Sequence, residues 1–170
     1  MDEVERLIEV FRTHPTAPVF WKLDVLMDLE HVHDARVVRF LLQVLEERRE
    51  PAAVLMRVVR LARTCNCPAA ETRASVARAL MDVLTSAEGA ELRVDAALAL
   101  AEYTDVHTVP AALGGLASNA AESLELRYSA FTSLQRTGPT AECADLLRRL
   151  LTDEALGLSA RSVLASWQLQ

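Results

Sequence analysis

The chain has 170 residues, of which 24 are acidic and 18 basic, and its net charge is −6. Hydrophobic residues make up 51% of the chain but aromatic residues only 5%, so Ala, Leu and Val supply most of the apolar surface and favour packed helices over strands. No run approaches eighteen uncharged apolar residues, which argues against a membrane-spanning helix, and the acidic balance disfavours a nucleic-acid ligand.

The N-terminal segment predicts a short amphipathic helix. Val4, Leu7, Ile8 and Phe11 share one helical face within residues 1–14. The segment is acidic and unlike a secretory leader, which begins with basic residues. The three cysteines are an odd number and indicate no disulfide framework. We therefore expect a cytoplasmic protein whose first helix caps the helices after it.

Apolar triplets with the spacing i, i+4, i+7 then recur along the chain and predict a series of helices. The triplets begin at positions 37, 76, 109 and 143, so they are separated by 39, 33 and 34 residues, a period typical of helical repeats. Their members are Val37, Leu41 and Val44; Val76, Leu80 and Val83; Val109, Leu113 and Leu116; and Cys143, Leu147 and Leu150.

A second helix precedes each triplet and completes a helical hairpin. Leu92, Ala96, Ala97 and Leu100 align with Leu126, Ala130, Phe131 and Leu134, and Trp21, Val25, Leu26 and Leu29 take the same places in the first hairpin. We expect Asp34, Asp105 and Thr140 to cap second helices of the hairpins. The predicted single domain over 1–170 comprises a capping helix (1–14), repeats (18–50, 51–86, 87–120 and 121–152) and a terminal helix (153–170).

The third hairpin resembles a HEAT-like repeat of the short type named after phycobilisome lyases. Its sequence runs Leu92-Arg93-Val94-Asp95-Ala96-Ala97-Leu98-Ala99-Leu100, then Asp105, then Thr108-Val109-Pro110 with Leu113. The resemblance implies an all-α fold: a right-handed α-solenoid of about four helical hairpins, a capping helix and a C-terminal half repeat. It also implies a binding platform, and it does not imply lyase activity, because such repeats occur in unrelated proteins.

In solenoids of this kind the second helices line the concave face. Positions that point away from the predicted core on these helices are the expected partner-binding residues: Arg36, Arg39, Gln43, Arg78, Asp82, Ala111, Gly115 and Arg149. Gly114 and Gly115 fall in the middle of a helix, where glycine costs stability. They predict either a tight helix crossing or the close approach of another backbone.

Basic residues are concentrated in the middle of the chain. Positions 36–78 hold nine Arg and four Glu, a net charge of +5 within a chain of net charge −6. Arg57, Arg60 and Arg63 share a helical face and form a possible anion-binding edge, with a solvated face paired to Glu46, Glu47 and Glu50 as the alternative. The expected partner is a protein or an acidic peptide.

Two predicted turns carry residues that bind metals. His31 and His33 lie in one turn and Cys65 and Cys67 in the next, so stacked hairpins would bring them to one edge, where they could hold zinc or respond to redox conditions. The one-residue spacing within each pair is shorter than usual for zinc. Cys143 occupies a core position instead.

No catalytic motif is present in the sequence. It lacks a glycine-rich phosphate loop, a G-x-S-x-G motif and an H-E-x-x-H motif. Fold analogy alone leaves an enzyme resembling DNA glycosylases or lyases as a further alternative, and the two indoles that a glycosylase would need, Trp21 and Trp167, are predicted to face the core. We therefore expect a non-catalytic protein-interaction scaffold or adaptor, with the metal- or redox-responsive module as its main alternative.

Overall fold

The computed structural model describes residues 2–65, 67, 69–86 and 89–168. Within these ranges the regular structure consists of ten α-helices and one 3₁₀ helix, and no strand occurs. The all-α prediction is therefore confirmed. The Cα positions divide the chain into two compact units, residues 1–80 and 81–170.

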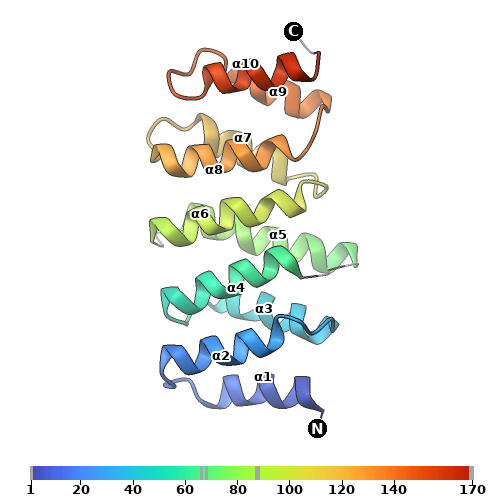
Figure 1. Ribbon diagram of the computed structural model, residues 1–170, viewed down its shortest axis with the longest axis vertical. Helices are drawn as coiled ribbons and strands as arrows, with labels where there is room; N and C mark the ends of the chain where they lie inside the picture. Colours follow the sequence, from blue (N-terminus) through green and yellow to red (C-terminus); the bar gives the residue numbers. More distant parts are fainter. Residues whose placement is uncertain (1, 66, 68, 87–88, 169–170) are drawn as a thin grey trace. The chain divides into compact units, whose positions relative to one another are not determined.

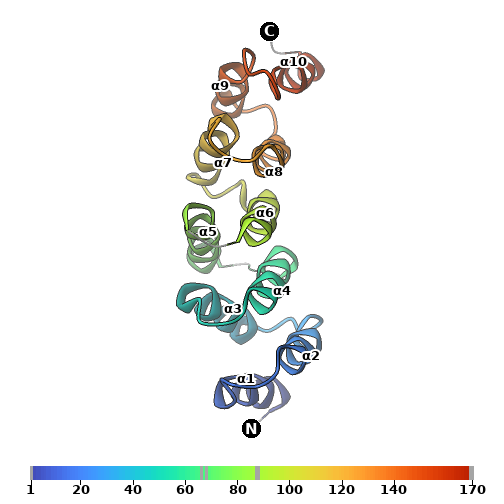
Figure 2. The same cartoon turned by 90° about the vertical axis from the view of Figure 1, so that its left-hand side faces the viewer.

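The first unit is a two-layer arrangement of helices. In Figure 2, α1 and α3 lie on one side and α2 and α4 on the other. Contacts between α1 and α3 and between α2 and α4 hold each layer together, and α3 also packs against α4. The helices of this unit are α1 (Glu3–Thr13), α2 (Val19–Leu29), α3 (Ala35–Glu47), α4 (Ala52–Thr64) and the part of α5 (Ala70–Thr85) that precedes residue 81.

The second unit repeats this layering. Here α7 and α9 lie on one side and α6, α8 and α10 on the other (Figures 1 and 2). The closest packing joins α8 to both α6 and α7, and α9 packs against α7 and α10. Its elements, after the end of α5, are α6 (Ala90–Ala99), η1 (Leu100–Tyr103), α7 (Val109–Ser118), α8 (Leu124–Gln135), α9 (Ala141–Arg149) and α10 (Gly157–Ser166).

The apolar periodicity of the sequence corresponds to the cores of the two units. Every member of the four triplets is buried except Leu116, which is half-buried. The aligned residues of the preceding helices are also buried, except for Trp21. Burial of these side chains supplies the main driving force for packing, since each hairpin alone leaves one apolar face exposed.

Helix ends follow local capping chemistry in two of three predicted cases. The Asp34 carboxylate accepts a hydrogen bond of 2.8 Å from the Arg36 backbone N–H at the start of α3, and the Thr140 hydroxyl accepts one of 3.2 Å from Cys143 at the start of α9. The Asp105 prediction is wrong, because α7 begins later and Thr108 occupies its N-cap position without a side-chain cap. The preceding helix runs on into η1, which displaces the turn.

Three basic residues occupy equivalent positions in three hairpins and make equivalent bonds. Lys22, Arg93 and Arg127 each come directly after the first aligned core residue of their helix. Lys22 Nζ donates to the Pro15 carbonyl (3.1 Å) and pairs with Glu50 (2.5 Å).

The two arginines repeat this pattern in the second unit. Arg93 Nε donates to the Leu84 carbonyl (2.8 Å), and its other nitrogens bind both oxygens of Glu122. Arg127 Nε donates to the Ala117 carbonyl (2.9 Å), and its guanidinium pairs with Asp153. Each cation thus donates to a backbone carbonyl at or just after the end of the preceding helix. It also pairs with a carboxylate that follows the next helix. These bonds satisfy a charged group that burial would otherwise leave without partners.

Candidate functional site

Three of the predicted partner-binding residues lie together in the first unit. Arg36, Arg39 and Gln43 project from successive turns of α3 and line an open cavity of about 450 Å³ between α3 and α1. A second cavity of about 310 Å³ adjoins it, and both are lined by Arg12, Phe40 and Gln43. Because both cavities are lined by these three residues, we describe them together as the α1–α3 groove.

Two buried aromatic side chains form the floor of the α1–α3 groove, and most of its other lining residues are charged or polar. Phe11 of α1 and Phe40 of α3 meet edge to face, with ring centroids 5.1 Å apart. The Arg12 guanidinium lies 5.9 Å from the Phe40 ring centroid and hydrogen-bonds to the Gln43 side chain. Cation–π contacts of this kind hold a charged side chain over an apolar surface. The exposed lining therefore offers a peptide segment mainly polar contacts.

The rim of the groove carries charges of both signs, and Arg36 is already paired. Its guanidinium binds the Asp34 carboxylate (2.7 Å) and the Asp2 carboxylate (2.8 Å). The same hydrogen bonds lower the pKa of Asp34 to about 2, the side-chain bond from Arg36 being the largest cause. Arg39 and, in the adjoining cavity, Arg49 are exposed and form no ion pair among the described residues, so both cations are accessible to a partner.

The remaining predicted contact residues are exposed on other second helices. Arg78 lies on α5 in the first unit. In the second unit, Gly115 lines a separate cavity of about 370 Å³ beside Ala112 and Leu116. Gly115 has open space around it, whereas a Cβ on Gly114 would lie 2.7 Å from the Leu146 side chain of α9. Gly114 therefore permits a tight crossing of α7 and α9. The other predicted contact residues on second helices are Asp82, Ala111 and Arg149.

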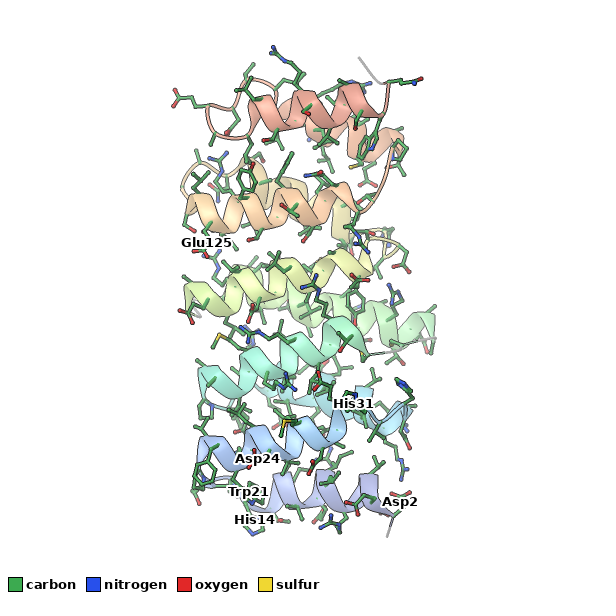
Figure 3. All side chains as sticks on the ribbon, in the orientation of Figure 1. Asp2, His14, Trp21, Asp24, His31 and Glu125 are labelled. Atoms are coloured by element: carbon green, nitrogen blue, oxygen red, sulfur yellow. The ribbon has the colours of Figure 1, made fainter. Side chains whose placement is uncertain are left out.

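Of the turn residues predicted for metal or redox chemistry, His33 lies near the two cysteines, whereas His31 lines neither of the cavities that His33 shares with them. His33 lines a 350 Å³ cavity together with Cys67 and a small one of about 20 Å³ together with Cys65. His31 is exposed in the same turn, where Figure 3 labels it. Burial raises the pKa of Cys67, which disfavours its thiolate. Within the described ranges, which omit 66 and 68, no group of three metal-binding side chains occurs.

Part of the basic segment 36–78 is neutralised by ion pairs within the first unit. Arg57 pairs with Glu30 at 2.7 Å, and not with the glutamates at the end of α3 that the sequence suggests as partners. Glu50 is taken by Lys22. Arg57 is therefore less available to an external anion than its sequence position indicates. The side chains of Arg60 and Arg63 are exposed on α4.

Neither tryptophan is buried, contrary to the sequence prediction. Trp21 is half-buried and its indole lies 5.3 Å from the His14 ring, both at one end of the first unit in Figure 3. Trp167 is half-buried at the C-cap of α10.

Sequence reasoning missed Arg12 and Phe40 as lining residues of the groove. Phe40 falls outside the triplet Val37, Leu41 and Val44, and Arg12 belongs to the helix that the sequence predicts only as a cap. The sequence signal that could have identified Phe40 is a large aromatic residue next to an apolar triplet.

A search of protein-family models found no match to this chain, and a search of curated proteins found none either. The length and apolar character that a helix needs to cross a bilayer are not reached by any helix among the described residues. Arguments about function therefore rest on the chain's own residues.

Proposed function

We propose that the protein is a non-catalytic adaptor of HEAT-like, α-solenoid type that binds a protein or acidic peptide through its second helices. The α1–α3 groove carries this proposal. Phe11 and Phe40 form its buried floor, charged and polar side chains form most of its remaining lining, and the exposed Arg39 lies on its rim. A polar peptide segment with an acidic residue opposite Arg39 complements that lining.

Two recurring features support the repeat interpretation. The cation at the position of Lys22 recurs as Arg93 and Arg127, and each makes the same two kinds of bond. The layering of first and second helices also recurs. Repeats of this kind commonly display extended binding surfaces because each hairpin contacts only its neighbours.

The test is a charge reversal on two second helices, at Arg39 within the groove and at Arg78 outside it. Immobilised wild-type protein, Arg39→Glu, Arg78→Glu and the control Arg63→Glu would be compared for the proteins each captures from a cell extract, by quantitative mass spectrometry. Arg63 is also an exposed arginine but lies on a first helix. We expect at least one captured protein to bind wild type and the control equally and to be depleted about tenfold or more by Arg39→Glu, since like charges at an interface oppose binding. Equal recovery by all four baits would refute the groove as a binding site.

A second candidate is a metal- or redox-responsive role for the turn residues. The observation in its favour is that His33 shares cavities with both Cys65 and Cys67. Elemental analysis of protein purified without chelator provides the test. Stoichiometric zinc in wild type and its loss in Cys67→Ser would support this role, whereas absence of zinc in wild type together with unchanged behaviour under oxidant would exclude it.

A further inference from the structure

The largest exposed apolar side chains lie on first helices, away from the predicted partner face. Tyr128 and Leu124 are 46% and 56% exposed on α8, and Leu158 is 80% exposed on α10. The other two large exposed apolar residues, Phe20 and Met27, lie on α2 in the first unit. A cluster of exposed apolar side chains on a small protein commonly marks an interaction surface. We call the surface formed by Leu124, Tyr128 and Leu158 the α8–α10 face.

The structure holds this face in one conformation. The Tyr128 hydroxyl hydrogen-bonds to the Ser159 hydroxyl at 3.2 Å and so links α8 to α10. The Tyr128 ring also meets the buried Phe131 ring edge to face, with centroids 6.0 Å apart. Leu124 lies one turn before Tyr128, and Leu158 directly precedes Ser159. A tyrosine fixed at both ring and hydroxyl loses little freedom when it is covered, which suits it to the centre of an interface.

Opposite charges flank the three apolar residues. Glu125 lies three residues before Tyr128 on the same face of α8, and Figure 3 shows it at the start of that helix. Arg161 lies three residues after Leu158 on α10. Both are exposed, and within the described part of the chain neither side chain forms an ion pair. The acid is thus on one helix and the base on the other, and neither is neutralised internally.

From this arrangement we infer that the α8–α10 face binds a second copy of the same chain. A two-fold axis between the helices sets α8 of one copy against α10 of the other. Glu125 then meets Arg161 of the second copy, and the symmetry forms the same pair again on the opposite side. Leu124, Tyr128 and Leu158 from both copies occupy the centre, which excludes water from them.

The charges single out a second copy from other occupants. An unrelated apolar helix would cover the three apolar residues but would not need an acid on one side and a base on the other. A two-fold interface requires self-complementarity, and one acid and one base on separate helices provide it. Since three apolar side chains per copy cover less than the ~800 Å² per partner of a standard interface, we expect a dissociation constant on the order of 10–100 µM.

The first measurement is the molar mass in solution as a function of concentration, by sedimentation equilibrium. Wild type is expected to rise from 18.7 kDa toward twice that mass as the concentration passes through the expected dissociation constant. Leu158→Asp is expected to stay monomeric, because it places a carboxylate at the apolar centre. The matched control Phe20→Asp alters a similarly exposed apolar residue of the first unit and is expected to dimerise as wild type does. Circular dichroism confirms that each variant is folded.

A charge swap tests the two-fold arrangement itself. Glu125→Arg alone and Arg161→Glu alone each place like charges together twice per dimer, so each is expected to weaken dimerisation by about tenfold or more. The double variant Glu125→Arg/Arg161→Glu restores opposite charges and is expected to recover wild-type affinity. A wild-type mass of 18.7 kDa at every concentration would overturn the inference. So would a dimer that the single reversals leave unchanged, or that Phe20→Asp abolishes.

Discussion

Asp34 both caps α3 and binds Arg36, and its low pKa makes its contribution to stability depend on pH. The folded-state pKa is about 2, below the ordinary value of 3.8. A carboxyl whose pKa is lowered by folding contributes stability that is fully present above its unfolded pKa and is lost as the pH falls toward its folded pKa. The contribution of Asp34 is therefore expected to disappear between about pH 4 and pH 2.

Asp34→Asn isolates this effect, since asparagine also caps helices but does not titrate in this range. We expect the gap between the urea midpoints of wild type and variant to be widest near pH 5 and to narrow steadily on acidification to pH 2. Other acids with lowered pKa values, such as Asp153 and Glu122, titrate equally in both proteins. A gap that stays constant across this range would contradict the assignment.

Two of the three roles that depend on near neighbours were predicted correctly, Asp105 being the exception, and roles that depend on distant residues were not predicted. Asp34 and Thr140 were identified as caps because a cap bonds to a backbone N–H two or three residues ahead. The partner of Arg36 from α1, Asp2, is 34 positions away in the sequence, so local patterns contain no trace of it. Cys143 was assigned to the core from its place in a triplet, and burial raises its pKa to about 11.

On α7, two adjacent glycines have opposite surroundings and should respond differently to substitution. A Cβ at Gly114 would lie 2.7 Å from Leu146 of α9, whereas none of the surrounding atoms lies within 4 Å of a Cβ at Gly115. Gly115→Ala is expected to stabilise the protein by about 1 kcal/mol, because alanine favours a helix interior. Gly114→Ala gains the same preference but displaces Leu146, so its net effect should be smaller or destabilising.

Thermal and urea denaturation of the two variants would measure this difference. A greater stabilisation by Gly114→Ala than by Gly115→Ala would show that α7 and α9 do not cross as closely as the structure places them. Gly115→Ala also bears on binding, because Gly115 is a predicted contact residue. A stabilised variant that captures its partner less well would indicate that another backbone approaches at Gly115.

Helical register was readable from the sequence, but the bonds between helices were not. The triplets identified the buried face of each second helix because a fixed spacing repeats on one side. Arg57 and Arg60 interrupt the apolar stripe of α4 in the sequence, yet Val54, Val58 and Leu61 beside them are buried. The recurrence of Lys22, Arg93 and Arg127 was visible in the alignment, but their shared carbonyl and carboxylate partners require the packed structure.

For the whole chain, the sequence predicted an all-α fold, and no sequence feature marks the boundary between the two compact units. A continuous period of 33 and 34 residues runs through the second half, and the longer step of 39 falls in the first. The boundary between the units follows residue 80, inside α5, and the amino-acid composition of the sequence does not change there. Apolar periodicity indicates which face of a helix is buried. It does not indicate how extensively one hairpin packs against the next.

Lys22 is the chain's one lysine, and its side chain is 1% exposed. An endoproteinase specific for lysine therefore has a single cleavable bond, in the first half of α2, which it reaches only when that helix opens. Cleavage monitored against urea reports on residues 1–80 alone, whereas far-ultraviolet circular dichroism reports on both halves. Coincident transitions would mean that the molecule melts as one cooperative body, and cleavage at lower urea would mean that its N-terminal half melts first.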